Sequence, residues 1–157
     1  LLLGRVEEGR LSFSPVPLEL DAICRKLCDE MRSATKGSSP IRYTANNSLA
    51  GAISDEPLLR HILSNLLSNA VKYSQPGGAV DFTATRDGDD IVFAVQDHGI
   101  GIPKEEQAKL FTSFTRASNV GQRQGTGLGL VVVQRCVTCH GGSLDLVSEL
   151  GQGTIVK

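Results

Sequence analysis

The sequence feature that most constrains the fold is an apolar run that ends at a carboxylate. Residues 91–95 (IVFAV) are apolar and rich in β-branched side chains, which predicts a buried strand. Asp97 follows this run, and two glycines, Gly99 and Gly101, come directly after it. Glycine has no Cβ, so the backbone there can adopt positive φ or lie close to a ligand. The carboxylate could accept a hydrogen bond from a ligand's amino group, although a plain Asp-Gly turn carries the same letters.

Length and charge narrow the class of protein. A chain of 157 residues predicts one domain with a core large enough to need no disulfide staples. Its 16 basic and 17 acidic residues give a net charge of −1, which argues against a nucleic-acid or membrane-surface partner. No apolar run approaches the length of a membrane span, and the Leu1–Leu3 start lacks the flank of a signal peptide. We expect the chain to be a piece of a longer protein.

The four cysteines could suggest a metal or haem site. Cys24 and Cys28 lie one turn apart on a helical pattern, and residues 136–140 spell C-x-x-C-H, the sequence form of c-type haem attachment. The apolar helix predicted around that motif leaves no loop to hold a haem, and Met31 is the only methionine that could serve as its second ligand. We therefore expect buried, reduced cysteines in a cytosolic chain and no haem or zinc.

A long helix is predicted over residues 55–73, with Asp55 or Ser54 as its cap and Pro57 in its first turn. Its core stripe consists of Leu59, Ile62, Leu63, Leu66, Leu67, Ala70 and Val71. Four polar side chains share another face: Asn65, Asn69, Lys72 and Tyr73. Such a face could simply be solvated. It could also offer an oxygen ligand to a hard cation and a lysine to a phosphate.

A glycine-rich stretch, GTGLGL at residues 125–130, leads directly into a helix predicted to run through Val137. Glycines before a helix N-terminus expose backbone N–H groups to an anion, and the helix dipole favours negative charge there. The stretch is not a Walker A motif, because no Gly-Lys-Ser/Thr follows. It is not a dinucleotide fingerprint either, because Leu130 takes the third-glycine position and no strand precedes it.

The remaining elements follow from apolar periodicity and turn residues. Helices are predicted at residues 1–8, 18–31 and 104–109. Strands are predicted at residues 11–14, 41–45, 51–54 and 144–147, after the turn at 151–154, and as an antiparallel hairpin formed by 79–86 and 91–96. A weakly structured span follows the hairpin and runs to about residue 124. Spans of that length in compact domains are usually functional or mobile.

Four motifs occur in order: NLLSNAVKY (65–73), DHGIGIP (97–103), LFTSFTR (110–116) and GTGLGL (125–130). The series resembles the N, first-glycine, F and second-glycine boxes of sensor histidine kinases, whose superfamily includes DNA gyrase, Hsp90 and MutL. The resemblance covers nearly the whole chain, up to GQGT at 151–154. It implies an α+β fold, the Bergerat ATP-binding fold. This is a two-layer α/β sandwich whose mixed, mostly antiparallel sheet has helices on one face, with ATP under a lid at about residues 98–126.

The resemblance also implies roles for individual residues. Asp97 would accept a hydrogen bond from the adenine amino group, and Gly101 would give the base room. Asn69 would ligate a Mg²⁺ ion that bridges the phosphates, with Asn65 close to it. Lys72 and Arg116 would neutralise phosphate charge, Tyr73 would flank the nucleotide, and Gly125, Gly127 and Gly129 would form the lid hinge and the phosphate-facing helix start. The full set of nucleotide-binding candidates is Asn65, Asn69, Lys72, Tyr73, Asp97, Gly99, Gly101, Ile102, Arg116, Gly125, Thr126, Gly127, Leu128, Gly129 and Leu130, with Asn65, Lys72 and Arg116 as the catalytic candidates.

The branch of the superfamily follows from one position. The resemblance implies that ATP-hydrolysing members carry a glutamate one helical turn before the metal-binding asparagine, where it activates water. Asn65 stands there in this chain and cannot accept a proton, which favours transfer to a protein nucleophile. None of His61, His98 or His140 stands in a His-Glu/Asp-x-x-x-Pro setting, so the acceptor histidine is expected upstream. We interpret His98 as part of the lid surface.

The sequence is therefore expected to be the catalytic domain (residues 11–157) of a two-component sensor histidine kinase, an ATP:protein-histidine phosphotransferase. Residues 1–10 resemble the end of the second dimerisation helix and a linker. The expected cofactors are ATP and Mg²⁺, and the expected partners are the protein's own dimerisation and histidine phosphotransfer domain and a response regulator receiver domain. The parent is expected to be a homodimer, soluble or membrane-anchored, with this domain in the cytoplasm. The isolated domain is expected to be a monomer inactive in autophosphorylation. The alternatives are a degenerate nucleotide-binding regulatory module and a gyrase-like ATPase.

Overall fold

The structure is a computed structural model that describes residues 12–157 except 36, 38, 113–114, 116 and 122–126. The predicted helix at residues 1–8, and with it the proposed dimerisation-helix tail, lies outside the described residues. Within the part of the chain that is described, no helix combines the length and apolar composition needed to cross a bilayer.

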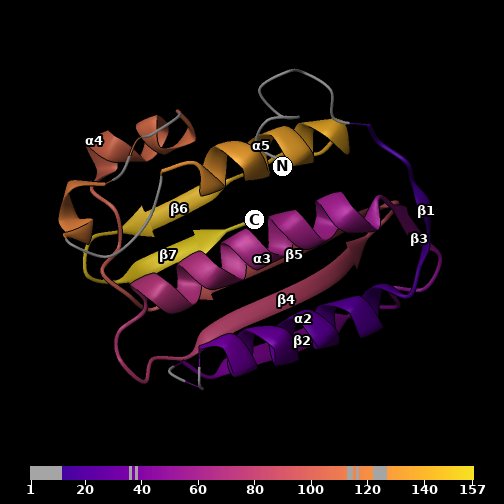
Figure 1. The fold of residues 1–157 in the computed structure, drawn as a ribbon, viewed down its shortest axis with the longest axis horizontal. Helices are drawn as coiled ribbons and strands as arrows, with labels where there is room; N and C mark the ends of the chain where they lie inside the picture. The colour runs from indigo at the N-terminus through magenta and orange to yellow at the C-terminus, as the bar shows by residue number, and fades with distance from the viewer. Residues whose placement is uncertain (1–11, 36, 38, 113–114, 116, 122–126) are drawn as a thin grey trace.

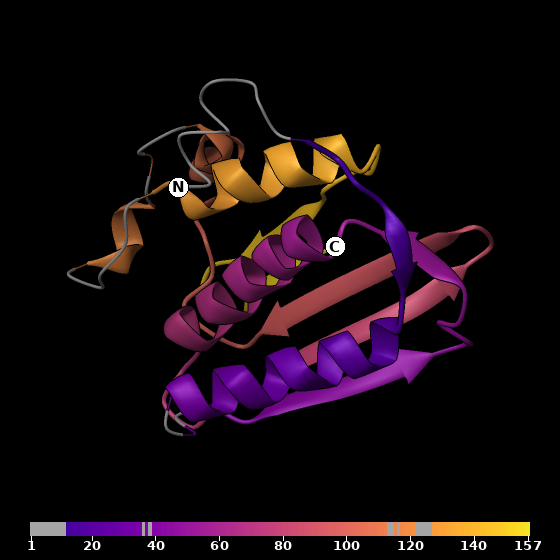
Figure 2. The same cartoon turned by 45° about the vertical axis from the view of Figure 1, so that its right-hand side comes forward.

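The described residues form a five-stranded sheet with helices on one face. The strand order is β2-β4-β5-β7-β6; β2 and β4 are parallel, and every other neighbouring pair is antiparallel. Helices α2, α3 and α5 all lie in front of this sheet (Figures 1 and 2), which confirms the predicted two-layer α+β sandwich. The bounds are β2 Ile41–Asn46, β4 Val80–Asp87, β5 Asp90–Asp97, β6 Leu146–Glu149, β7 Gly153–Val156, α2 Leu20–Ala34, α3 Glu56–Tyr73 and α5 Gly129–Cys139.

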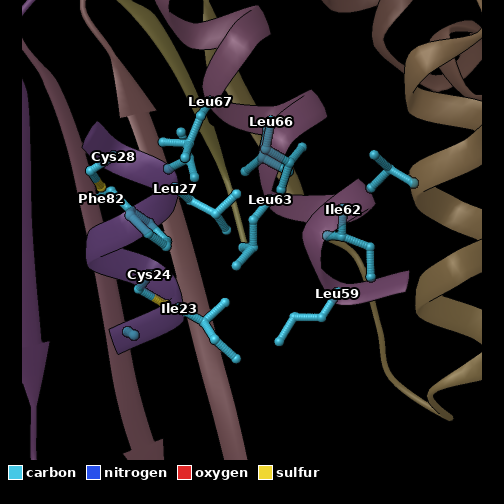
Figure 3. Packing of buried hydrophobic residues seen from close by; sticks show 14 of the residues in the cluster. Ile23, Cys24, Leu27, Cys28, Leu59, Ile62, Leu63, Leu66, Leu67 and Phe82 are labelled. Atoms are coloured by element: carbon cyan, nitrogen blue, oxygen red, sulfur yellow. The ribbon is translucent and has the colours of Figure 1, made fainter. Parts of the chain in front are cut away.

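The core lies between the helices and the sheet. Leu63 and Leu67 of α3 and Phe82 of β4 have no exposed surface, and the apolar stripe of α2 packs beside them (Figure 3). The stripe predicted for α3 is buried along its whole length. All four cysteines are free thiols, and burial raises the pKa of Cys24 and Cys136 to about 11, which keeps them protonated. They act as small core residues.

Helix α3 begins at a carboxylate that binds two segments of chain. Asp55 caps the helix by accepting the N–H of Leu58 on Oδ1 at 3.0 Å. Its other oxygen accepts the N–H of Ser14 at 2.9 Å, from the segment that enters the domain. Asp55 is buried and Ser14 is exposed, so only the carboxylate side of this contact is shielded from water.

The strand predicted at residues 11–14 is wrong. The first strand in the described part of the chain is β1 (Val16–Leu18), which pairs with β3 (Ala52–Ser54) in a separate two-stranded sheet. The N–H of Ser14 goes to the Asp55 side chain instead of a neighbouring strand. The other elements predicted within the described residues are present with shifted ends. Helix α2 begins and ends later than predicted, β6 lies two residues further along, and the span after Asp97 holds α4 (Lys104–Gln107), η1 (Ala108–Phe111) and η2 (Ser118–Val120).

Candidate functional site

A cavity of about 690 Å³ opens between α3, the loop after β5, β7 and the N-terminus of α5. The described residues that were predicted to bind a ligand and that line it are Asn65, Asn69, Lys72, Tyr73, Asp97, Gly101, Ile102, Gly127, Gly129 and Leu130. Residues as far apart in the sequence as Asn65 and Leu130 therefore line one cavity. A concave site of this volume, with apolar walls and few polar groups, is typical of a small-molecule site.

The α3 wall places its polar side chains by helical spacing. Asn65 donates its side-chain N–H to the carbonyl of His61, one turn earlier, at 2.8 Å. This leaves its Oδ1 near the start of α5, since a Cβ added to Gly129 would lie 3.0 Å from that oxygen. A side chain at position 129 would therefore press against the Asn65 amide, so glycine suits the close approach of α5 to α3 here. Lys72 lies with Nζ 4.6 Å from the centroid of the Tyr73 ring, a cation–π contact that holds the ammonium at the cavity wall.

The buried carboxylate at the end of β5 is held by the main chain. Asp97 is buried, and its Oδ1 accepts the N–H of Gly99 at 2.9 Å. Burial raises the pKa of Asp97, while the backbone N–H groups of Gly99 and Thr154 oppose that shift by stabilising the charged form. The carboxylate is thus an acceptor fixed at one end of the cavity.

The loop after Asp97 lies so close to its neighbours that only glycine fits at positions 99 and 101. A Cβ on Gly99 would overlap the carbonyl of Tyr73, and a Cβ on Gly101, where φ is +64°, would overlap the carbonyl of Glu149. Residue 100 fixes the loop on both sides, because its N–H donates to Tyr73 at 3.2 Å and its carbonyl accepts the N–H of residue 151 at 2.8 Å. The loop is clamped between the end of α3 and the β6–β7 turn.

A further wall is formed by the short helix η2 and its neighbours. Asn119 donates its side-chain N–H to the carbonyl of Gly101 at 2.8 Å. Glu106 accepts the N–H of Ser118 at 2.8 Å, and that backbone hydrogen bond lowers the pKa of Glu106. Single side chains therefore hold this segment against the glycine loop and against α4.

Not every predicted site residue lines the cavity. Gly99 packs against Tyr73, and Leu128 precedes α5 without facing the cavity. Arg116, Gly125 and Thr126 lie outside the described residues. His98 does not line the cavity; it contacts Asp81 at 3.3 Å.

Other lining residues were not predicted as ligand contacts. The polar ones are Ser68, Thr115 and Thr154, which belong to the NLLSNAVKY, LFTSFTR and GQGT motifs. Apolar periodicity cannot distinguish the apolar ones from core residues: Leu66, Ala70, Val95, Ile100, Leu110, Ala117, Val120, Leu146 and Val156.

Comparison with known proteins decides the family. Residues 54–157 match the family described as histidine kinase-, DNA gyrase B-, and HSP90-like ATPase. The chain belongs to this ATPase family. It is 36% identical over 157 residues to the circadian input-output histidine kinase CikA of Synechococcus elongatus, which covers 97% of this chain and 21% of CikA. It is 40% identical over 101 residues to the adaptive-response sensory kinase SasA of the same species, over 64% of this chain and 26% of SasA.

Solved structures of this ATPase family agree with the sheet and helix arrangement. The crystal structure of full-length ShkA in complex with AMPPNP gives a TM-score of 0.84 at 30% identity, over 98% of this chain and 32% of that one. The mycobacterial sensor histidine kinase MprB gives a TM-score of 0.74 at 26% identity, over 92% and 94% of the two chains. The predicted identity as a histidine kinase ATPase domain is confirmed. The chain spans about a fifth of the length of CikA.

Proposed function

We propose that this domain binds Mg²⁺-ATP in the cavity and transfers the γ-phosphate to a histidine on a dimerisation domain of the parent protein. One observation carries the proposal: a single cavity joins the buried Asp97 to the polar face of α3 and the N-terminus of α5. A carboxylate suits the amino group of a base, and a helix N-terminus beside a lysine suits phosphate. The solved complex of the related ShkA with AMPPNP supports a nucleotide ligand.

The base end of the cavity is assigned to adenine. Asp97 would accept a hydrogen bond from the amino group, because its oxygens face the cavity from the end of β5 and are held by backbone N–H groups. Gly101 leaves room for the base, and Ile102 adds an apolar contact beside it. Gly99 acts indirectly, because it shapes the loop through its close approach to Tyr73.

The other end is assigned to the phosphates. Lys72 would neutralise phosphate charge from the α3 wall, with Tyr73 beside it, and the first N–H groups of α5 would donate to phosphate oxygens near Gly129. Gly127 and Leu130 complete this wall. We extend the proposal to Arg116 as a phosphate ligand, and to Gly125, Thr126 and Leu128 as the start of the phosphate-facing segment.

The residues at this end fit a magnesium ion held chiefly by its nucleotide. Mg²⁺ usually keeps several waters and takes one or two protein oxygens together with substrate phosphates. The described residues hold no cluster of three or more His, Cys, Asp or Glu side chains that could bind a metal alone. Asn69 on the cavity wall supplies one oxygen of the required hard type, with Asn65 one turn away. Bound there, Mg²⁺ would offset charge on the transferring phosphoryl group.

Transfer is favoured over hydrolysis by what surrounds the phosphate end. Asp97 is the only carboxylate among the described residues that line the cavity, and it lies at the base end. Asn65, in the position of a water-activating glutamate, has its amide N–H occupied by the His61 carbonyl and carries no basic oxygen. A nucleophile from another domain is then needed.

The partners are proposed from the same logic. We propose that residues 1–10 continue a dimerisation helix, that the acceptor histidine lies on that domain, and that a receiver domain takes the phosphate from it. The parent would act as a homodimer with this domain in the cytoplasm, whereas the isolated domain would be a monomer. Four free cysteines suit a reducing compartment.

Incubation with γ-labelled ATP tests the proposal. The isolated chain should bind ATP, hydrolyse it barely above background and take up no acid-labile phosphate, and addition of the upstream dimerisation helices should restore labelling. Lys72→Ala should reduce the restored labelling without unfolding the domain. Binding without any labelling of the full parent would indicate the degenerate regulatory module. Rapid phosphate release by the isolated chain would indicate a gyrase-like ATPase.

A further inference from the structure

An aromatic ring and a lysine ammonium lie against each other on the cavity wall at the end of α3. Nζ of Lys72 lies 4.6 Å from the centroid of the Tyr73 ring, and both side chains are half-buried and line the cavity. Among the described residues that line it, Lys72 carries the only cationic side chain and Tyr73 the only aromatic one. A cation within about 6 Å of a ring centroid is attracted by the negative face of the ring, more strongly where water is excluded. The ring therefore defines a preferred place for the ammonium on this wall.

The main chain of Tyr73 is fixed on two sides. Its carbonyl accepts the N–H of Ile100 at 3.2 Å, and a Cβ on Gly99 would overlap that carbonyl. The next residue, Ser74, is buried, donates its N–H to the carbonyl of Ala70 at 2.9 Å, and forms a β-bridge with Gly99. The last turn of α3 and the loop after β5 thus hold the same short stretch of backbone. The ring keeps only the two torsions of its own side chain.

The lysine beside it is much less constrained by its own chemistry. The ammonium of Lys72 is carried on a flexible four-carbon stem, and ordering such a side chain on binding costs rotamer entropy. A contact that already holds the ammonium at the wall lowers this cost, because less freedom remains to be lost when a ligand binds. An ammonium has three hydrogens, so the side that faces away from the ring can still donate to a phosphate oxygen. The contact with Tyr73 and a contact with phosphate are therefore compatible.

We propose that Tyr73 is a positioning residue for the phosphate end of the site: the face of its ring holds the Lys72 ammonium where the phosphates bind. The proposal rests on the nucleotide site proposed above and gives Tyr73 a role that acts through Lys72, beyond its place beside the nucleotide. The ring can hold the lysine because its own backbone is held by the loop after β5.

Substitutions separate the ring face from the other properties of Tyr73. Tyr73→Phe keeps a ring face and should keep the contact, whereas Tyr73→Leu removes the ring and should release the ammonium. If the ring acts through Lys72, the loss depends on the phosphates of the ligand. Tyr73→Leu should therefore weaken the binding of ATP about fivefold and that of adenosine by less than twofold. Lys72→Met removes the charge and keeps the length of the side chain, so in that background Tyr73→Leu should leave the ratio of the two Kd values unchanged.

The experiment measures Kd for ATP and for adenosine on the purified chain, in the same magnesium buffer, by competition against a fluorescent ATP analogue. Each protein is checked for folding by urea unfolding. The proteins compared are the wild type, Tyr73→Phe, Tyr73→Leu, Lys72→Met and the double variant Lys72→Met/Tyr73→Leu. The ratio of the adenosine Kd to the ATP Kd should fall about fivefold in Tyr73→Leu and stay within twofold in Tyr73→Phe.

A second cation–π pair supplies the matched control. Arg25 lies over the Tyr43 ring at 5.4 Å, and neither residue lines the cavity. Tyr43→Leu should lower the free energy of unfolding, because Tyr43 packs against Phe82 and hydrogen-bonds to Asp21, and it should leave the Kd ratio unchanged. If Tyr43→Leu does not fold, Arg25→Met removes the same remote pair and serves as the control.

The outcomes separate this inference from the proposed function. Equal weakening of ATP and adenosine in Tyr73→Leu would mean that the ring acts on the nucleoside directly, and would overturn the inference. Tighter binding of ATP would overturn it too, since the ring would then compete with phosphate for the ammonium. A fall in ratio that persists in the Lys72→Met background would exclude Lys72 as the group through which the ring acts. If Tyr73→Leu does not fold, Tyr73→Met carries the same test, because its unbranched side chain also lacks a ring. Failure of the wild type to bind ATP at all would overturn the proposed function itself.

Discussion

Two walls of the cavity, the loop after β5 and the η2 wall, are held in place by different kinds of contact. At the base end, Gly99 and Gly101 bring backbone against backbone, and Asp97 is held by main-chain N–H groups. Along the η2 wall, single side chains, Asn119 and Glu106, make the connection. Backbone contact cannot be rearranged without moving whole elements, whereas a side-chain hydrogen bond can break and reform at a cost of about 1 kcal/mol. We therefore expect the loop around Asp97 to be rigid and the η2 wall to be able to shift its position.

The largest effect is expected from Gly101→Ala, which tests whether the loop around Asp97 is rigid. The new Cβ would overlap the Glu149 carbonyl and would sit at a φ of +64°, so the free energy of unfolding should fall by about 3–5 kcal/mol. Gly77→Ala is the matched control, because its φ is +74° but nothing lies within 4 Å, and it should cost only about 1–2 kcal/mol. Urea unfolding measures both. Equal losses would show that the base end is no more rigid than an open turn.

Asp97→Asn tests whether the fixed end recognises the nucleotide. One acceptor oxygen becomes a donor that faces the amino group of the base, so ATP affinity should fall about 10- to 150-fold, or roughly 1.5–3 kcal/mol. Titration with a fluorescent ATP analogue measures the change. Equal affinities would reduce Asp97 to a turn residue.

The pKa of Asp97 gives the same variant a second signature. Burial raises the pKa of Asp97 in the folded protein above its pKa in the unfolded chain. The protonated carboxyl therefore contributes to the free energy of unfolding at pH values below the unfolded pKa. This contribution is lost as the pH rises through the folded pKa. Asp97→Asn should thus retain the stability of the wild type at neutral pH. Binding has the opposite dependence. Wild-type ATP affinity should fall, relative to that of Asp97→Asn, as the pH drops through the raised pKa. A ratio that stays constant with pH would contradict this.

Asn69→Ala tests whether the proposed phosphate end of the cavity binds the metal ion. It removes a proposed oxygen ligand, so affinity for Mg²⁺-ATP should fall about tenfold while affinity for metal-free ATP changes by less than threefold. Calorimetry with magnesium and with a chelator measures both. Equal losses in the two conditions would assign Asn69 to the nucleotide instead of the metal.

The smallest effect is expected at the η2 wall. Asn119→Ala removes the hydrogen bond to the Gly101 carbonyl and should weaken ATP binding about two- to fivefold, roughly 0.5–1 kcal/mol. Asn46→Ala, which removes an exposed hydrogen bond to Thr85 on the sheet, is the control and should leave binding unchanged. A loss as large as that of Asp97→Asn would mean that this wall is not adjustable.

The sequence predicts much of the site because helical and strand periodicity act locally. Spacing alone places Asn65, Asn69 and Lys72 on one face of α3, and the apolar run before Asp97 places that carboxylate at a strand end. These predictions depend on a few neighbouring residues, and the structure brings all four side chains to one cavity.

What could not be predicted depends on contacts between distant residues. That Gly99 packs against Tyr73 and does not line the cavity depends on how α3 ends beside the loop. The hydrogen bond between the hydroxyls of Thr154 and Ser148, which lie six positions apart on different strands, depends on the register of β6 and β7. The strand predicted at 11–14 is wrong because the N–H of Ser14 donates to Asp55, 41 positions away, and no local pattern indicates that contact.

That contact between Ser14 and Asp55 also has a mechanical consequence. The Asp55 carboxylate hydrogen-bonds both to Ser14 and to Leu58 in the first turn of α3, so the two segments are joined directly through one side chain. Helix α3 has 18 residues, which at about 1.5 Å per residue make a rod of roughly 27 Å. Lys72 and Tyr73 stand at its far end. A displacement of Ser14 would therefore act on the first turn of α3, and the rigid helix would carry it to Lys72 and Tyr73 in the cavity wall.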